Sequence, residues 1–421
     1  MKNILHIATM DQGGAWTATY RLHHLLKKSH HSKLLVKTKS LYDHDILQYR
    51  KSQKEKLLDY LFFKWRSLLK QNDNTFDKNY YFHNSSENFP NYNLVKFIRE
   101  NNIRPDIVIL HWVSGFVNTK NILDLEKAFT CKVLWYCLDM SPLTGGCHYA
   151  WSCENYKSQC HNCPALPTNN FKDIAFKNFK IKQKNIALSN LTVVSSTPWV
   201  SNQVAQGALF QNKKHKEILL SVNPDIFAPI DKKIARTVLR VPVDKKIILT
   251  GSSSVNDLRK GTIYFFEAIS TFYKSLSENE RNDYFILISG DYHDMYKNLP
   301  FPHKCTGFLK DEISLALTYQ SADIYICTSI EDTGPMMINE SIQCGTPVIA
   351  FEMGVAVKLV EHGITGYRNT LKDSDGLAKS ILTYFTMDDK MRAEMSNNCR
   401  KIGLELLHPK RQQQAFEDLF N

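Results

Sequence analysis

The sequence lacks the long apolar runs that membrane-spanning helices need. Nowhere in its 421 residues do about 18 uncharged apolar residues follow one another. Its first residues, MKNILHIATMDQ, carry one lysine, and Asp11 breaks their apolar run before it reaches the length of a secretory signal. We therefore expect a cytoplasmic protein.

Glycine and proline are also scarce, at 17 and 14 residues, which leaves little room for long disordered tracts. The composition is ordinary for a folded protein, and the length favours two domains of roughly 200 residues over a single core. Acidic residues number 42 against 53 lysines and arginines, which gives a net charge of +11. The protein should therefore favour anionic partners, such as nucleotides, phosphates, anionic lipids or nucleic acid, although charge alone does not choose among them.

Cysteine is distributed unevenly. Six of the ten cysteines are scattered among apolar neighbours, where they fit small core positions. The other four lie in one polar stretch, TGGCHYAWSCENYKSQCHNCP (144–164): Cys147, Cys153, Cys160 and Cys163. In a reducing compartment this clustering favours a structural Zn²⁺ site, although only the last pair has the tight spacing of zinc knuckles. Reduced thiols and disulfides stay open as alternatives. A catalytic role is not expected, because four thiolates leave no open metal position.

Short apolar runs alternate with helical patterns along most of the chain, which predicts two doubly wound, Rossmann-like α/β domains with mostly parallel sheets. The predicted strands are 2–9, 33–38, 106–113, 132–139, 191–196, 218–222, 245–253, 284–291, 322–329 and 346–352. We expect an N-terminal domain over 1–214, a second domain over 215–400, and a C-terminal helix over 401–421 that packs back on the first domain. Ligands of such sheets bind at the carboxyl ends of the strands, so two domains facing each other would enclose a central cleft.

Residues 40–104 depart from this rhythm. They include KSQKEKLLDYLFFKWRSLLKQ, in which lysines and an arginine flank an apolar stripe at helical spacing. The stripe comprises Leu57, Leu61, Trp65, Leu68 and Leu69. Packing on its own domain is the commoner arrangement for such a helix, and contact with the inner face of the plasma membrane is the alternative.

The stretch TSIEDTGPMMINESIQCGTPVIAF (328–351) is the most informative one. A strand leads into an acidic turn containing Glu331 and Asp332, and Pro335 fits the first position of a helix whose N-terminal amides would bind phosphate. Glu340, inside that helix, would reach a ribose hydroxyl. The same pattern also occurs in proteins that bind nothing there, so the rest of the domain must decide.

A second strand ends in Gly251 and Ser252, before Arg259-Lys260-Gly261 at another helix start. Arginine binds pairs of oxygens and lysine supplies a compact charge, so the two cations suit a diphosphate. A solvated charge pair is the ordinary state of surface cations. The position at the ligand-binding end of a strand favours the anion site.

These motifs resemble those of bacterial family 4 glycosyltransferases, retaining enzymes of the GT-B fold that use nucleotide-sugar donors. The likeness covers residues 1–40 and 106–421. GGAWTATYRL resembles the family's first glycine loop, RKG its phosphate-binding cations, and EDTGPMMINESIQCGTPVIAF its two-acid signature. The most similar subgroup has His-Trp in its third strand, as at His111 and Trp112, and a Thr-Gly-Gly-Cys-His-Tyr segment with four cysteines.

The resemblance implies that the cations and the helix N-terminus stabilise the departing diphosphate, whose oxygen takes the acceptor's proton on the same face, without an enzyme nucleophile. It implies catalytic roles for Arg259, Lys260, Glu331, Asp332 and Glu340. It implies donor contacts for Gly13, Gly14, Asp139, Gly251, Ser252, Gly334, Pro335, Met336 and Met337.

The chain also departs from the family pattern. The two acids of the signature are usually eight positions apart, which fits Asp332 and Glu340, so Asp332 is favoured for the sugar, with Glu331 beside it. Leu138-Asp139 replaces a His-Asp pair that the subgroup often has. No Asp-x-Asp motif follows a ligand-facing strand, so no catalytic metal is expected.

We therefore predict a hexosyltransferase that moves a sugar from a nucleotide sugar to a glycan acceptor, lipid-linked, in capsule, O-antigen or exopolysaccharide synthesis. A non-hydrolysing sugar-nucleotide epimerase is the nearest alternative. An NAD-linked dehydrogenase would show G-x-G-x-x-G, which DQGGAW lacks. A zinc-dependent nucleic-acid-binding protein would not explain the second half, so no nucleic acid is expected as a partner.

Overall fold

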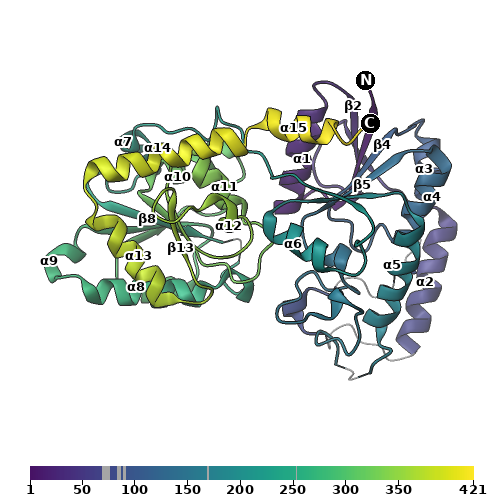
Figure 1. Ribbon diagram of the computed structural model, residues 1–421, viewed down its shortest axis with the longest axis horizontal. Coiled ribbons are helices and arrows are strands. Elements are labelled where there is room, and N and C mark those ends of the chain that lie inside the picture. The colour runs from purple at the N-terminus through teal and green to yellow at the C-terminus, as the bar shows by residue number, and fades with distance from the viewer. Residues whose placement is uncertain (69–75, 83–86, 89–91, 168–169, 253) are drawn as a thin grey trace. The chain divides into compact units, whose positions relative to one another are not determined.

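A computed structural model describes residues 1–68, 76–82, 87–88, 92–167, 170–252 and 254–421 (Figure 1). The chain forms two compact units. The first comprises residues 1–196, 200–218 and 413–421, and the second comprises residues 197–199 and 219–412. The end of the chain therefore returns to the unit in which the chain begins.

The first unit is built on a seven-stranded parallel sheet of order β3-β2-β1-β4-β5-β6-β7. Its interior strands are apolar on both faces, as a parallel sheet covered by helices requires. The strands are β1 (Asn3–Met10), β2 (His31–Thr38), β3 (Ile46–Gln48), β4 (Ile107–Leu110), β5 (Lys132–Cys137), β6 (Thr192–Ser195) and β7 (Lys214–Glu217). The helices are α1 (Gly14–Leu26), α2 (Gln53–Leu68), α3 (Leu94–Glu100), α4 (Thr119–Phe129), α5 (Ile174–Leu188), α6 (Pro198–Gln206) and, near the C-terminus, α15 (Pro409–Glu417), with short 3-10 turns at η2 (Lys78–Tyr80), η3 (Ser141–Leu143) and η4 (Asn155–Lys157).

The second unit has a six-stranded parallel sheet of order β10-β9-β8-β11-β12-β13. Its strands are β8 (Lys246–Gly251), β9 (Tyr284–Ser289), β10 (His303–Cys305), β11 (Ile324–Cys327), β12 (Val348–Phe351) and β13 (Gly366–Asn369). Its helices are α7 (Lys232–Leu239), α8 (Thr262–Ser275), α9 (Glu278–Arg281), α10 (Glu312–Ser321), α11 (Met336–Gln343), α12 (Ala356–Leu359), α13 (Ser374–Thr386) and α14 (Asp389–Leu406), with 3-10 turns at η5 (Leu258–Lys260) and η6 (Asp294–Asn298).

Both sheets reverse their strand order once, between β1 and β4 in the first unit and between β8 and β11 in the second. In the second unit, α8 and α13 pack together on one face of the sheet, while α10 and α14 lie on the other (Figure 1). The connections on the two sides of a reversal go to opposite faces, which leaves a crevice at the carboxyl ends of the two strands. The predicted pair of doubly wound, parallel Rossmann-like domains is confirmed.

Four strands are not among the predicted ones, and all four lie at the edges of the two sheets: β3, β7, β10 and β13. An edge strand needs no continuous apolar run, and β7, Lys-His-Lys-Glu, carries charges that block pairing with another chain. Because β7 pairs with β6, the domain boundary expected at residue 214 falls inside a strand, and the structure places it after Ile218. Residues 218–222, predicted as a strand, form none. The expected single helix over 401–421 is instead the end of α14 followed by α15.

The predicted amphipathic helix within residues 40–104 corresponds to α2. Its first turn is tied to the unit by Glu55, which accepts hydrogen bonds from the Tyr49 hydroxyl at 2.5 Å and the Asn93 amide at 3.1 Å. The side chains of Leu57 and Leu61 are 57% and 51% exposed. The rest of the predicted stripe, at positions 65, 68 and 69, lies outside the residues whose side chains the structure describes. Within the described part of the chain, no helix is both long and apolar enough to span a membrane.

Candidate functional site

The predicted cations and acids of the second unit meet at the reversal of its strand order. Arg259 and Lys260 follow β8 in η5, and Glu331 and Asp332 follow β11 in the next turn. The two segments are joined directly, because the Thr328 hydroxyl donates to the Lys260 carbonyl at 3.0 Å and the Ile330 amide donates to the Arg259 carbonyl at 2.8 Å.

Gly261 allows this close approach. Its φ of +60° is left-handed, and a Cβ there would lie 2.0 Å from the Thr328 carbonyl oxygen. A side chain at position 261 would therefore push the cationic turn away from β11. Gly251, at the end of β8, is similarly confined, because its Cβ would lie 2.3 Å from the Ser289 carbonyl oxygen. Ser252 follows Gly251, directly after the carboxyl end of β8.

Lys260 forms an ion pair with Asp332, with 2.5 Å between Nζ and Oδ2. The other carboxylate oxygen of Asp332 accepts the Gly334 amide at 3.0 Å, which holds the turn that leads to α11. Burial opposes both charges, but their mutual attraction outweighs it, so the pKa of Asp332 is lowered and that of Lys260 is raised. The Asp332 side chain is 8% exposed, whereas that of Lys260 is 21% exposed. The cation is thus fixed in place and still reaches solvent.

Arg259 is more deeply buried and has its own acid, Asp257. The Asp257 carboxylate caps η5 by accepting the Arg259 amide at 3.1 Å, and it also pairs with the Arg259 guanidinium. Each of the two cations is therefore paired with an aspartate, Arg259 with Asp257 and Lys260 with Asp332. Lys260 is the more accessible of the two cations, because Arg259 is only 8% exposed.

The helix after the acidic turn begins at Met336, with Pro335 as its N-cap, one residue later than the sequence predicts. Pro335 has φ −60° and ψ 113°, so it enters the helix from extended backbone. The amides of Met336 and Met337 belong to the first turn, where helical amides have no partner within the helix. Gly334, beside them, packs against the backbone of Gly354, whose Cβ would lie 3.1 Å from the Gly334 nitrogen.

Glu340 is buried, and its Oε2 accepts a hydrogen bond from the hydroxyl of Tyr319 at 2.9 Å. Tyr319 comes from α10 and is fully buried. Burial, followed by the charge of Glu340, raises the pKa of Tyr319 well above its usual range, so this hydroxyl keeps its proton and remains a donor. Tyr319 therefore fixes the carboxylate that the sequence analysis assigns to a ribose hydroxyl.

Gly13, Gly14 and Asp139 belong to the first unit. Gly13, with φ +85°, is the N-cap of α1, and a Cβ at Gly13 or Gly14 would meet no atom within 4 Å. These two residues follow β1, at the reversal of the first sheet. Asp139 follows β5 and is buried.

Asp139 is engaged by the cysteine-rich segment. Its carboxylate lies 2.7 Å from His148 Nδ1 and accepts the Ser141 amide at 2.8 Å. Burial would raise the pKa of Asp139, but His148 and Ser141 together lower it, so the acid is ionised. The Trp112 indole nitrogen lies 3.0 Å from the same His148 nitrogen. His148 of the cysteine-rich segment thus lies beside Asp139, which directly follows Leu138.

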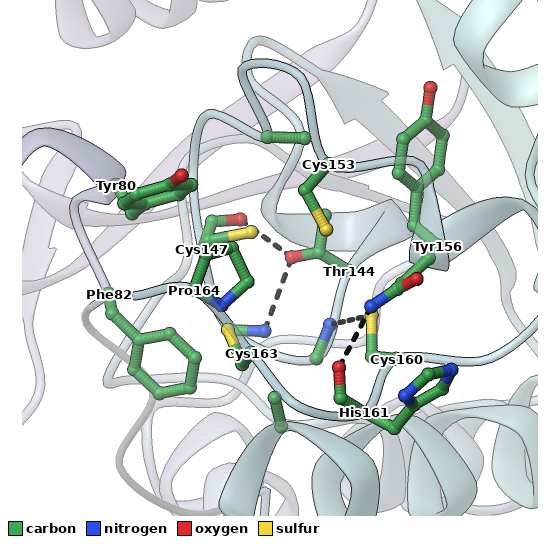
Figure 2. A pocket seen from close by; sticks show the side chains of 15 residues that line it. Tyr80, Phe82, Thr144, Cys147, Cys153, Tyr156, Cys160, His161, Cys163 and Pro164 are labelled. Atoms are coloured by element: carbon green, nitrogen blue, oxygen red, sulfur yellow. Dashed lines mark hydrogen bonds between the residues drawn. The ribbon is translucent and has the colours of Figure 1, made fainter. Parts of the chain in front are cut away.

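The four clustered cysteines line a single cavity, together with Tyr80, Phe82 and Thr144 (Figure 2). All are free thiols. In the described part of the chain, no three histidine, cysteine, aspartate or glutamate side chains are already spaced to hold a metal ion.

The first unit also contains a row of three buried histidines that the sequence analysis does not identify. His111 Nε2 lies 2.9 Å from His6 Nδ1, and the His6 ring contacts that of His23 edge to face. His23 Nδ1 lies 2.8 Å from the Ser32 hydroxyl, and its Nε2 lies 3.4 Å from Asp45. No pattern of spacing marks these residues, because they come from β1, from α1 and from the position directly after β4.

Residues 231–402 match the family described as glycosyl transferases group 1, so the second unit contains a group 1 glycosyl transferase domain. An uncharacterised glycosyltransferase of Methanocaldococcus jannaschii is 26% identical over 198 residues, which are 45% of this chain and 49% of that protein. The matched part thus spans about half the length of that relative.

Two solved structures share the fold over the whole chain. Sucrose-phosphate synthase of Thermosynechococcus elongatus has a TM-score of 0.68 at 15% identity, and covers 100% of this chain and 98% of its own. HepE of Anabaena, in complex with UDP-glucose, has a TM-score of 0.65 at 15% identity, and covers 100% and 99%. The two Rossmann-like units are therefore those of a GT-B fold.

Proposed function

We propose that the protein is a retaining family 4 glycosyltransferase that moves a sugar from a nucleoside diphosphate sugar to a glycan acceptor. One observation carries the proposal: Lys260 and Asp332 pair at the strand-order reversal of the group 1 domain. A cation that an acid holds in place, but that still reaches solvent, is ready to bind a diphosphate. The UDP-glucose in the HepE structure makes UDP-sugars the first donors to test.

The residues support a mechanism without an enzyme nucleophile. When the bond between the anomeric carbon and the phosphate oxygen breaks, negative charge builds up on the diphosphate. Lys260, Arg259 and the first amides of α11 would stabilise that charge. A diphosphate oxygen would take the acceptor hydroxyl's proton on the same face, so the sugar keeps its configuration. Asp332, Glu331 and Glu340 would orient donor hydroxyls, and no catalytic metal is proposed.

Donor binding is testable by thermal stabilisation. A nucleotide sugar at about 100 times its Kd adds about 2.7 kcal/mol, which raises the Tm of a domain of this size by roughly 5 to 10 °C. We expect one of a panel of UDP-, GDP- and ADP-sugars to give this shift with the wild type, and Lys260→Ala to lose it. Lys297→Ala, an exposed lysine of the same unit, is the matched control and should keep it.

The outcome of the reaction separates transfer from its nearest alternative. A sugar-nucleotide epimerase would consume the stabilising donor in the absence of any acceptor.

The thermal test also has an outcome that contradicts the donor site. If the donor raised the Tm of Lys260→Ala as much as that of the wild type, Lys260 would not belong to the donor site.

We further propose that the acceptor is lipid-linked, in capsule, O-antigen or exopolysaccharide synthesis, and that α2 contacts the inner face of the plasma membrane. The exposed side chains of Leu57, Leu58 and Leu61 support this contact. Lys54, Lys56 and Lys64 are exposed on the same helix, as binding to anionic headgroups requires.

Flotation with vesicles tests the membrane contact. We expect the wild type to float with vesicles rich in phosphatidylglycerol. Leu57→Glu/Leu61→Glu should float at least 10-fold less, because burying each leucine contributes about 1.5–3 kcal/mol. Leu188→Glu, 67% exposed on α5 of the same unit, is the control and should float like the wild type. The proposal is wrong if the wild type stays in solution or the double variant floats equally well.

A further inference from the structure

Residues 144–173 form a long connection with little structure of its own. Between η3 and α5, the only regular element among its described residues is the 3-10 turn η4. Connections of more than about 15 residues without secondary structure are uncommon in compact domains, because they bury too little apolar surface to offset their ordering. This segment nevertheless has a defined path, since Gly145, Cys147 and Cys160 are all buried.

The path is set by close backbone contacts at its start. A Cβ at Gly145 would lie 2.2 Å from the Ala175 carbonyl oxygen, and one at Gly146, with φ +148°, would lie 2.5 Å from the Phe82 ring. The Asn178 side chain donates to the Gly145 carbonyl at 3.0 Å. These contacts bring the first cysteine of the segment towards the other three.

The four cysteine side chains line one cavity from different directions (Figure 2). Along the chain, Cys147 and Cys153 precede η4, and Cys160 and Cys163 follow it. The cavity has a volume of about 10 Å³, which is the room that one water-sized body occupies. None of the other six cysteines of the chain lines it.

The surroundings of the thiols suit a bound cation. The Gly145 amide donates to Cys160 Sγ at 3.3 Å, and amide hydrogen bonds to sulfur stabilise metal-bound thiolates. The ammonium of Lys182 is also buried in this region and donates to the Ser141 carbonyl at 2.7 Å, three residues before the cysteine-rich segment begins. A positive charge in a buried site is favoured if the four-thiol cluster becomes anionic.

We propose that the four thiols bind one Zn²⁺ ion, which cross-links the segment from Cys147 to Cys163. Binding releases four thiol protons and forms four Zn–S bonds of about 2.3 Å. Because the thiols are not yet at ligand spacing, the ion must draw them inwards by rotating the side chains around the cavity. The ion would also fix His148, the neighbour of Cys147, against Asp139 at the end of β5.

Metal analysis of the untagged full chain tests the proposal. We expect about one zinc per chain by mass spectrometry, and less than a tenth of that in Cys153→Ser and Cys163→Ser, the two positions that are not fully buried. Cys305→Ser, equally half-buried but in the second unit, is the matched control and should keep its zinc. Reconstitution with Co²⁺ should give the visible absorption of tetrahedral cobalt thiolate in the wild type and the control only.

Thiol titration of the denatured chain, without reductant and with a chelator, distinguishes the alternatives. All ten thiols should react if the cluster binds zinc. Six reactive thiols, ten less the four of two disulfides, would overturn the proposal in favour of disulfides. Ten reactive thiols without zinc, after reconstitution has also failed, would overturn it in favour of plain thiols. Zinc retained in both serine variants would place the metal elsewhere. If a variant fails to fold, the wild-type metal content and cobalt spectrum still decide, independently of any donor.

Discussion

Replacing Lys260 with alanine is expected to lower kcat for sugar transfer about 10²- to 10³-fold. This is the loss that follows removal of one preorganised donor to charge that develops in a transition state. Both cations of η5 are paired with an aspartate, but Lys260 is the more accessible of the two, because its side chain is 21% exposed and that of Arg259 is 10% exposed. Steady-state kinetics with the stabilising donor and an accepting glycan would measure the loss.

Two further variants separate charge from structure in this prediction. Lys260→Ala leaves Asp332 buried without its ion-pair partner, which destabilises the unit by up to about 3 kcal/mol, so assays must run well below each variant's Tm. Lys260→Arg keeps the charge and should recover part of the rate, while Lys297→Ala should behave like the wild type. A rate for Lys260→Ala within twofold of the wild type would contradict the proposed role.

The interior of both sheets could be predicted from sequence because of how parallel sheets are covered. Strands such as β4, β8 and β11 have helices on both faces, so they appear as unbroken apolar runs. The edge strands carry no such signal. For β7 the polar sequence even places the domain boundary within a strand, and β13, Gly-Tyr-Arg-Asn, has the composition of a loop.

The site could be predicted only in part, for a similar reason. Arg259 and Lys260 were identifiable because two cations directly before a glycine, at the end of a buried strand, are informative within a few residues. The pairing of Lys260 with Asp332 joins positions 72 residues apart, and it depends on β8 and β11 being neighbours. Tyr319 lies on a helix, where a tyrosine is typical of the core, so its bond to Glu340 leaves no signal in the sequence.

The row of buried histidines, His6, His23 and His111, predicts that the first unit is acid-labile. Burial lowers the pKa of His6 well below 6.5, that of His23 to about 4 and that of His111 to about 3. Because the unfolded chain binds these protons at about pH 6.5, it gains protons before the folded chain does. The free energy of unfolding is therefore highest above pH 6.5 and falls as the pH drops towards 4, by about 1.4 kcal/mol per pH unit for each histidine that stays neutral.

Tryptophan fluorescence can follow this loss mainly in the first unit. Five of the six tryptophans belong to the first unit and Trp199 belongs to the second, so most of the signal comes from the first unit. We expect the urea midpoint of the wild type to fall steeply between pH 6.5 and 4.5. His111→Gln should be less stable at pH 7, where it disturbs the contact with His6, and should lose less stability on acidification, because one site of proton uptake is gone. His44→Gln, exposed in the same unit, should follow the wild type at every pH.

Equal pH slopes for His111→Gln and the wild type would mean that His111 is not held neutral. The loss of stability in acid would then have to come from the carboxylates. Those of Asp11, Asp43 and Asp45 have lowered pKa values and therefore lose their contribution only below about pH 4.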